Sequence, residues 1–266
     1  MSSSSRSVRQ LLPMLTLLAL VVAWQLVASA DTSHYVVIPP PSAILSKMVE
    51  DAGGLLMLDI PITLAETLIG LLLALALGVG VAALLDYSAT IKRAIYPLLV
   101  VSQTIPIFAL GVLLILAFGF DIKVKVMVVV LFCFFPISIA MIDGLASTDP
   151  DYIALLRAMG AKRYQVWRIV RFPASLPGLF SGLRIAATYS VTAAIVGEFI
   201  SSDHGLGHYL AIHFRQGQIV QGFVAIVLTA LLSIALVVIV NIVERLALPW
   251  YFTQARVEQW TEPGIF

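Results

Sequence analysis

Long apolar segments restrict this 266-residue chain to the folds that a lipid bilayer permits. A helix needs about 20 mainly apolar residues to cross the hydrocarbon core, and within that core every backbone polar group needs a partner inside the protein. Six segments meet this length, with approximate ends: 11–30, 60–85, 97–118, 124–142, 176–199 and 219–243. The sequence therefore predicts an all-α polytopic membrane protein with about six transmembrane helices.

The composition agrees with a membrane location. Hydrophobic residues make up 60% of the chain and charged residues 12%, which is about half the charged fraction of a soluble domain. The net charge is +1, so nothing indicates a nucleic acid partner. The lipid bilayer is the partner that the composition predicts.

The third apolar segment, PLLVVSQTIPIFALGVLLILAFG, contains Pro106 and Gly111. Proline removes a helical hydrogen bond, and lipid permits the freed backbone groups only where neighbours or a cavity satisfy them. We therefore expect this segment to be kinked or locally unwound. The polar residues beside the break, Ser102, Gln103 and Thr104, are candidates to line a translocation path.

The distribution of Lys and Arg predicts the orientation, because cytoplasmic loops carry an excess of both. If the N-terminus is inside, eleven cations lie on the cytoplasmic side: Arg6, Arg9, Lys92, Arg93, Arg157, Lys162, Arg163, Arg168, Arg171, Arg245 and Arg256. Four lie outside: Lys47, Lys123, Lys125 and Arg215. This count predicts that both termini are cytoplasmic in a multi-pass protein.

The first 59 residues are expected to hold the first membrane helix and an outer amphipathic segment. Arg6, Arg9, the apolar run and the sequence VASA before Asp31 also fit a cleaved signal peptide, which remains an alternative for residues 1–30. After three prolines, Ser42 is expected to cap a short helix on the outer surface.

The stretch RAMGAKRYQVWRIVRFP, residues 157–173, carries five basic residues and no acid. It belongs to the long cytoplasmic connection 143–175. Asp149-Pro150-Asp151 predicts a helix start, and Gly160 predicts its end, because glycine readily adopts the left-handed conformation of a C-terminal cap. A second short helix is expected from Lys162 to Phe172, ended by Pro173.

This connection resembles the coupling loop of ABC importer permeases. The family pattern is Glu-Ala-Ala, three residues, Gly, nine residues, Ile, any residue, Leu, Pro; here Gly160-Ala161 and Pro173 match it, with Val170 and Phe172 as apolar replacements. Ala154 departs from it, since the family commonly has Glu there, and Asp151 is a possible substitute. The residues that the resemblance assigns to ATPase coupling are Asp151, Ala154, Arg157, Gly160, Ala161, Arg168 and Pro173.

The resemblance implies a type I, MetI-like permease, with a transmembrane domain over 60–248 and a cytoplasmic tail over 249–266. It further implies three kinds of partner: an ABC ATPase subunit in two copies, a second permease copy forming a homodimer, and an extracytoplasmic substrate-binding protein. The expected location is the bacterial cytoplasmic (inner) membrane. The chain has no G-x-x-x-x-G-K-[ST] phosphate loop, so we expect ATP and Mg²⁺ on the partner ATPase and no cofactor on this chain.

The fifth segment carries two patterns. Small residues recur every four positions and predict a ridge for close helix packing, within the chain or at a seam between permeases: Gly178, Gly182, Ala186, Ser190 and Ala194. Its polar residues Thr188, Tyr189, Thr192 and Glu198 are further candidates for the path, because polar groups inside a membrane usually face a cavity or a partner.

Other classes of function are less well supported by the residues. A secondary transporter usually has internal repeats and carboxylates within the membrane, and an intramembrane enzyme needs a motif such as G-x-S-x-G. His204 and His208 are separated by two glycines, so no metal site is predicted. The resembling branch imports sulfonates, taurine, nitrate or thiamine-precursor pyrimidines, and the apolar, aromatic segments favour the flat pyrimidine.

Overall fold

A computed structural model of the chain describes residues 3–30 and 38–253, and every regular element in those ranges is helical. Five apolar stretches are long enough to cross a membrane: Leu12–Ala30, Ala52–Tyr87, Ile122–Ala146, Arg163–Ile200 and Ile219–Ala247. The long helices that make up most of these stretches are α1 (Ser3–Ala30), α4 (Ile60–Tyr87), α7 (Ile122–Ala146), α10 (Phe172–Ser201) and α12 (Ile219–Ala247).

Shorter helices connect and flank these spans. They are α2 (Pro41–Glu50), α3 (Ala52–Gly54), α5 (Ala89–Ser102), α6 (Ile107–Phe118), α8 (Pro150–Ala158), α9 (Arg163–Val166) and α11 (Leu206–Arg215). Two π-helical turns, η1 (Leu55–Asp59) and η2 (Trp167–Arg171), join α3 to α4 and α9 to α10.

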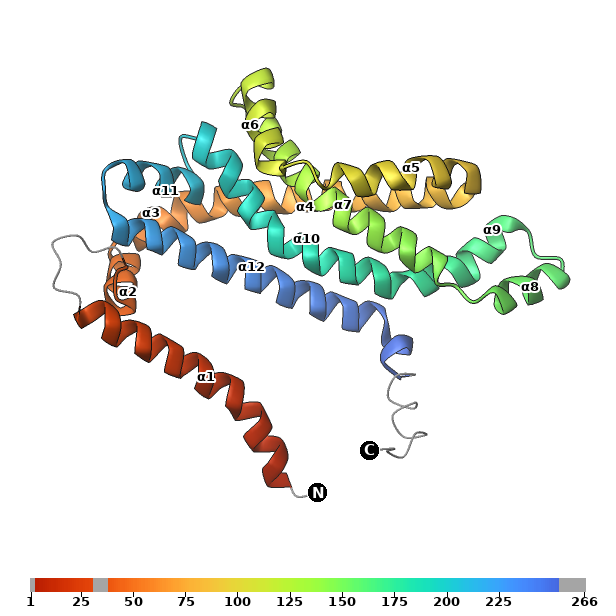
Figure 1. The fold of residues 1–266 in the computed structure, drawn as a ribbon, viewed down its shortest axis with the longest axis horizontal. Helices are drawn as coiled ribbons and strands as arrows, with labels where there is room; N and C mark the ends of the chain where they lie inside the picture. Colours follow the sequence, from red (N-terminus) through yellow and green to blue (C-terminus); the bar gives the residue numbers. More distant parts are fainter. Residues whose placement is uncertain (1–2, 31–37, 254–266) are drawn as a thin grey trace.

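Helix α7 lies at the centre of the bundle, between α4 and α10, and α12 packs on the far side of α10 (Figure 1). Glycines allow the close approach of these helices. A Cβ at Gly70 would lie 2.5 Å from Val129 on α7, and one at Gly78 would lie 2.8 Å from Ile137. The core is therefore a layer of helices packed through small residues, as is common where lipid provides no hydrophobic driving force.

The expected span 97–118 is broken into two helices. Helix α5 ends at Ser102, residues 103–106 form a turn, and α6 begins at Ile107, so the kink predicted at Pro106 is present. With 14 and 12 residues, neither helix reaches the length of a membrane span. In Figure 1, α5 runs back along α4, whereas α6 turns away from the bundle.

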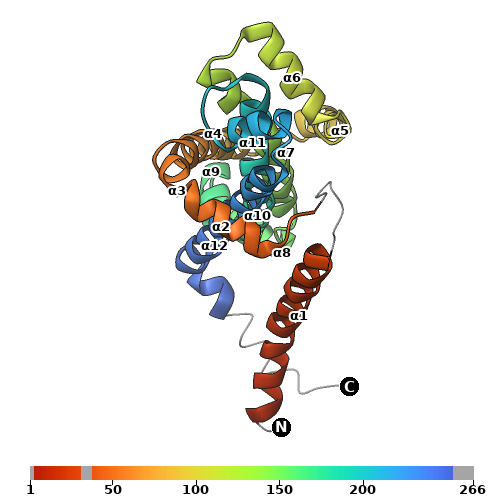
Figure 2. The same cartoon turned by 90° about the vertical axis from the view of Figure 1, so that its left-hand side faces the viewer.

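The N-terminal helix α1 leans away from the other helices in both views (Figures 1 and 2). It meets them near its end, where Gln25 bonds the backbone N–H of Ser42 at 3.0 Å. The expectation that Ser42 caps the next helix is wrong: Pro40 is the N-cap of α2, and Ser42 lies inside its first turn. Three consecutive prolines already impose the extended backbone that starts this helix.

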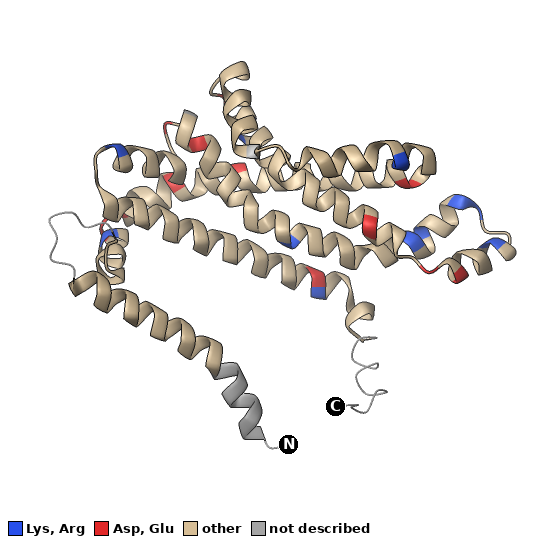
Figure 3. Cartoon of the chain, in the orientation of Figure 1, with Lys and Arg blue, Asp and Glu red and all other residues tan. Residues whose placement is uncertain are grey.

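Charged residues gather at the ends of the helices and leave their middle portions mostly uncharged (Figure 3). One end carries α8 and α9, where Lys and Arg prevail. The other end carries a smaller group in which acids and bases occur together. These two ends contain the candidate sites described next.

Candidate functional site

Helix α8 begins and ends as the sequence predicts. The Asp149 carboxylate accepts a hydrogen bond of 2.8 Å from the backbone N–H of Asp151, and Pro150 occupies the first turn. At the other end Gly160 has a φ of +83°, and the backbone N–H of Ala161 donates to the carbonyl of Leu156 at 3.0 Å. The left-handed glycine thus closes the helix and redirects the chain toward α9.

Helix α8 stands clear of the rest of the chain and buries none of its residues (Figure 1). Tyr152 and Leu155, three positions apart, are 61% and 58% exposed, and Met159 is 75% exposed. Residues at this spacing share one helix face. An exposed apolar face on a helix that carries charged residues is typical of a surface that binds another protein. Among the residues expected to couple, Asp151, Ala154, Arg157, Gly160 and Arg168 are exposed.

The second half of the loop differs from its prediction. Pro173 does not end a helix: the helical backbone continues from Arg163 through η2 into α10. The π-helical turn makes this possible, because the N–H of Phe172 bonds to the carbonyl of Trp167, five residues back, just before proline removes a donor. The helical backbone is therefore continuous from Arg163 through the apolar stretch that ends at Ile200.

Two arginines fasten this piece to the neighbouring helix ends. Arg171 forms an ion pair of 2.8 Å with Asp86 at the end of α4 and donates to the carbonyl of Leu145 on α7 at 3.1 Å. The Arg163 guanidinium lies 4.4 Å from the centre of the Tyr87 ring and donates to the Tyr87 carbonyl. These contacts connect α9 and η2 to the ends of α4 and α7.

Two of the candidate path residues line an open hollow of about 520 Å³ between α10, α11 and α12. Thr188 and Thr192 from α10 face Thr229 and Ser233 from α12, and the remaining described lining is apolar. The hydroxyls of Thr188 and Thr229 donate to backbone carbonyls of their own helices, at 2.9 and 2.6 Å. Their oxygen lone pairs remain available as acceptors.

The other path candidates lie elsewhere. Ser102 and Thr104 bond the carbonyls of Leu99 and Val101 in the turn between α5 and α6, and Gln103 is exposed beside them. Tyr189 is 53% exposed but is not part of the described lining of the hollow. The structure therefore brings Thr188 and Thr192 together and leaves the 102–104 group apart from them.

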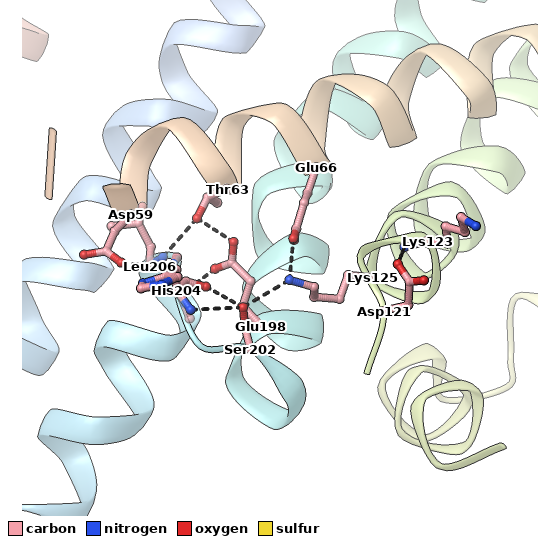
Figure 4. Close-up of polar contacts among 12 residues, drawn as sticks. Asp59, Thr63, Glu66, Asp121, Lys123, Lys125, Glu198, Ser202, His204 and Leu206 are labelled. Atoms are coloured by element: carbon pink, nitrogen blue, oxygen red, sulfur yellow. Dashed lines mark hydrogen bonds and ion pairs between the residues drawn. The ribbon is translucent and has the colours of Figure 1, made fainter. Parts of the chain in front are cut away.

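Glu198 belongs to a buried polar cluster at the end of the bundle opposite α8 and α9 (Figures 3 and 4). It is 1% exposed, accepts a hydrogen bond of 2.7 Å from Thr63 on α4, and accepts another of 2.7 Å from the N–H of Gly207. Beside it, Lys125 pairs with Glu66 at 2.5 Å and donates to Ser202 at 3.0 Å. A buried charge is costly unless it is paired. Lys125 has Glu66 as its counter-ion, whereas the Glu198 carboxyl group is held by hydrogen-bond donors.

The turn between α10 and α11 is held tightly by this cluster. The N–H of Gly205 donates to Asp59, and the N–H of Leu206 donates to Thr63, both at 2.9 Å. Gly205 has a φ of +108°, and a Cβ there would lie 2.3 Å from the carboxyl carbon of Glu198. Only glycine fits this position, so the turn and the carboxylate are built for each other.

The ridge on α10 packs within the chain. A Cβ at Gly178 would lie 2.9 Å from the carbonyl of Ala140, and one at Gly182 would lie 2.6 Å from the carbonyl of Pro136, both on α7. The ridge residues Ala186, Ser190 and Ala194 are fully buried. Packing within the chain accounts for the pattern without a seam between two copies.

The family model described as "Binding-protein-dependent transport system inner membrane component" matches residues 70–251, more than half of the chain. The chain belongs to this family. It is an ABC importer permease subunit, with the multi-helix membrane architecture that its sequence predicts.

Several curated permeases are similar along most of their length. The formylaminopyrimidine transport permease protein ThiX of Halalkalibacterium halodurans is 37% identical, over 92% of this chain and 98% of its own. The riboflavin permease RibX of Chloroflexus aurantiacus is 32% identical over 88% of each chain, and the taurine permease TauC of Escherichia coli is 25% identical over 89% and 88%.

The fold is also shared with a solved structure. The inward-facing MetNI methionine ABC transporter in its selenomethionine-soaked crystal form matches with a TM-score of 0.57 and 21% identity, over 70% of this permease and 94% of that chain. At this identity the likeness concerns the fold, and it supports the type I, MetI-like arrangement.

Sequence reasoning missed the partners that fix both ends of the permease. Asp86, which pairs with Arg171, was not among the predicted site residues. Lys125 was counted as an external loop charge, yet it is 7% exposed within the cluster around Glu198. A charged residue at the edge of an apolar segment was the available signal for an ion pair. The partner could not be identified from it, because the paired residues lie 59 or more positions apart in the sequence.

Proposed function

We propose that this permease forms the membrane path of an ATP-driven importer for a small, uncharged heterocycle that donates N–H hydrogen bonds, such as a thiamine-precursor aminopyrimidine. Two copies of the chain would enclose the path as a homodimer. Two ATPase subunits, carrying ATP and Mg²⁺, would bind beneath the cytoplasmic loops, and a substrate-binding protein would deliver the solute outside.

The exposed face of α8 is the observation that supports a partner ATPase. Tyr152, Leu155 and Met159 offer an apolar surface that nothing in the described chain covers. The loop behind it is tied to α4 and α7 by Arg163 and Arg171. Closure of an ATPase dimer would move α8, and the continuous helix from α9 to α10 would carry that movement to the hollow.

The chemistry of the hollow supports the class of substrate. Its polar groups are the hydroxyls of Thr188, Thr192, Thr229 and Ser233, and no charged side chain is among its described lining. An alkyl sulfonate, taurine or nitrate would lose hydration of its anionic group on entering the hollow, and no cation in the described lining would compensate for that loss. An aminopyrimidine can donate to the free lone pairs and place its ring against the apolar wall. The 37% identity to the formylaminopyrimidine permease points the same way.

The proposed orientation places both termini and the α8 loop in the cytoplasm of a bacterial cell. Eleven cations on the proposed cytoplasmic side against four outside support this orientation, because cytoplasmic loops carry an excess of Lys and Arg.

The substrate proposal is tested by measuring what the cognate binding protein binds and what the reconstituted complex imports. We expect tight binding and uptake of an aminopyrimidine and neither for taurine or nitrate. Thr188→Val and Thr229→Val should each lower uptake several-fold, because each removes an acceptor while keeping the volume. Tyr189→Phe, outside the hollow, is the matched control. Nanomolar binding of a sulfonate, with none of the pyrimidine, would overturn the substrate class.

A further inference from the structure

A second cavity, of about 590 Å³, lies between the cytoplasmic end of α4 and the loop formed by α8, α9 and η2. Its lining contains four cationic side chains and a single carboxylate: Arg157, Lys162, Arg163, Arg171 and Asp86. We propose that this cavity binds the phosphate-bearing headgroup of an anionic phospholipid of the cytoplasmic leaflet, of the phosphatidylglycerol type.

The charges of the cavity are only partly compensated within the chain. Asp86 is paired with Arg171 at 2.8 Å, and Arg163 is engaged by the ring and carbonyl of Tyr87. Arg157 and Lys162 form no ion pair with any carboxylate in the described ranges. Two cations thus face a cavity that contains no free counter-charge, which is the arrangement that attracts an anion.

The rest of the lining fits an amphipathic ligand better than a free anion. Ala83, Val166 and Trp167 form an apolar wall beside the cations. Leu84, in the same turn of α4 as Ala83, is 59% exposed, and Ile169 in η2 is 60% exposed. A phosphate group at the cations would leave the glycerol and the start of the acyl chains against these apolar side chains.

The position favours a lipid over an acidic side chain of a protein partner. The cavity includes the end of a membrane span, with Tyr87, Tyr164 and Trp167 around it, and aromatic residues of this kind gather at the level of lipid headgroups. Basic pockets between membrane helices on the cytoplasmic side bind anionic headgroups. Of the residues that the resemblance assigns to ATPase coupling, only Arg157 is among the described lining, and the exposed face formed by Tyr152, Leu155 and Met159 is not.

The test uses the full-length permease in nanodiscs of phosphatidylcholine with increasing phosphatidylglycerol, and counts bound lipid by native mass spectrometry. For Arg157→Gln/Lys162→Gln we expect about 30-fold weaker retention, roughly fivefold for each cation removed. The matched control is Arg93→Gln/Arg245→Gln, which removes two exposed cytoplasmic-side cations outside the described lining. It should retain the lipid like the wild type. Melting temperatures verify that both variants are folded.

Further arms separate the sources of the phosphate. Inorganic phosphate at millimolar concentration, added to permease in phosphatidylcholine alone, is expected to give no protection against heat, whereas phosphatidylglycerol should raise the melting temperature of the wild type. Protection by inorganic phosphate alone would overturn the lipid assignment. Equal lipid retention by both double variants and the wild type would also overturn it. So would normal lipid retention by Arg157→Gln/Lys162→Gln with loss of ATPase copurification, which would assign the cavity to an acidic group of the ATPase.

Discussion

Replacing Gly160 by valine tests how the shape of the cytoplasmic loop controls coupling. With φ at +83° and no atom within 4 Å of a Cβ, the substitution meets backbone strain and no steric clash. A β-branched residue in this region costs about 1–3 kcal/mol, so we take about 2 kcal/mol, which reduces the population of the capped conformation about 30-fold. The bond from the Ala161 N–H to Leu156 would be lost, and α8 would leave its orientation.

The assay measures substrate-stimulated ATP hydrolysis by the permease reconstituted with its ATPase and binding protein. Gly160→Val should lower the stimulated rate about 30-fold when the ATPase is subsaturating. Its melting temperature and membrane level should stay those of the wild type, because α8 buries no residue. Gly160→Asn should keep most of the stimulation, since asparagine tolerates the left-handed region. Wild-type coupling in Gly160→Val, or equal damage in both variants, would refute the reasoning.

Three further substitutions probe the anchors at the two membrane surfaces. Gly205→Ala should lower the free energy of unfolding by at least about 3 kcal/mol, because backbone strain adds to displacement of the buried Glu198. An unchanged melting temperature would contradict this. Arg171→Gln should lower the free energy of unfolding by about 3–5 kcal/mol, because it leaves Asp86 without its counter-ion. Limited proteolysis of the loop measures the effect, and adding Asp86→Asn should restore part of the protease resistance. Burial raises the pKa of Asp51, but hydrogen bonds from α2 and α11 outweigh burial and leave that pKa below its ordinary 3.8. The ionised Asp51, bonded to Tyr209 and Lys47, therefore stabilises the fold at neutral pH, and this stabilisation is lost as the pH falls through the lowered pKa. Asp51→Asn should make the melting temperature less dependent on pH in the acid range.

Local signals carried most of the architecture. Apolar length predicted the spans, and Asp149 and Gly160 predicted both ends of α8, because capping depends on residues within one turn. Pro106 predicted the break between α5 and α6. The sequence pattern did not predict that α5 and α6 would each be shorter than a membrane span, because this depends on how the two helices pack.

The errors and omissions involve contacts distant in sequence or unusual backbone turns. Thr63 and Glu198 are separated by 135 positions, and no local pattern links a threonine on one helix to a carboxylate on another. Pro173 was expected to end a helix, yet the π-helical turn at Trp167–Arg171 absorbs it. The sequence shows Gly205 and Gly207 but not the reason for them: a Cβ at Gly205 would lie 2.3 Å from the Glu198 carboxyl carbon, and one at Gly207 would lie 2.4 Å from the Ile195 carbonyl oxygen.

The central claim is that the loop beneath the membrane is moved by a separate ATP-hydrolysing subunit. The most direct measurement is uptake of the solute into proteoliposomes containing the permease, with its binding protein, in the presence and absence of the ATPase. We expect uptake only when the ATPase and Mg²⁺–ATP are both supplied. Uptake by the permease without the ATPase, driven by an ion gradient, would contradict it.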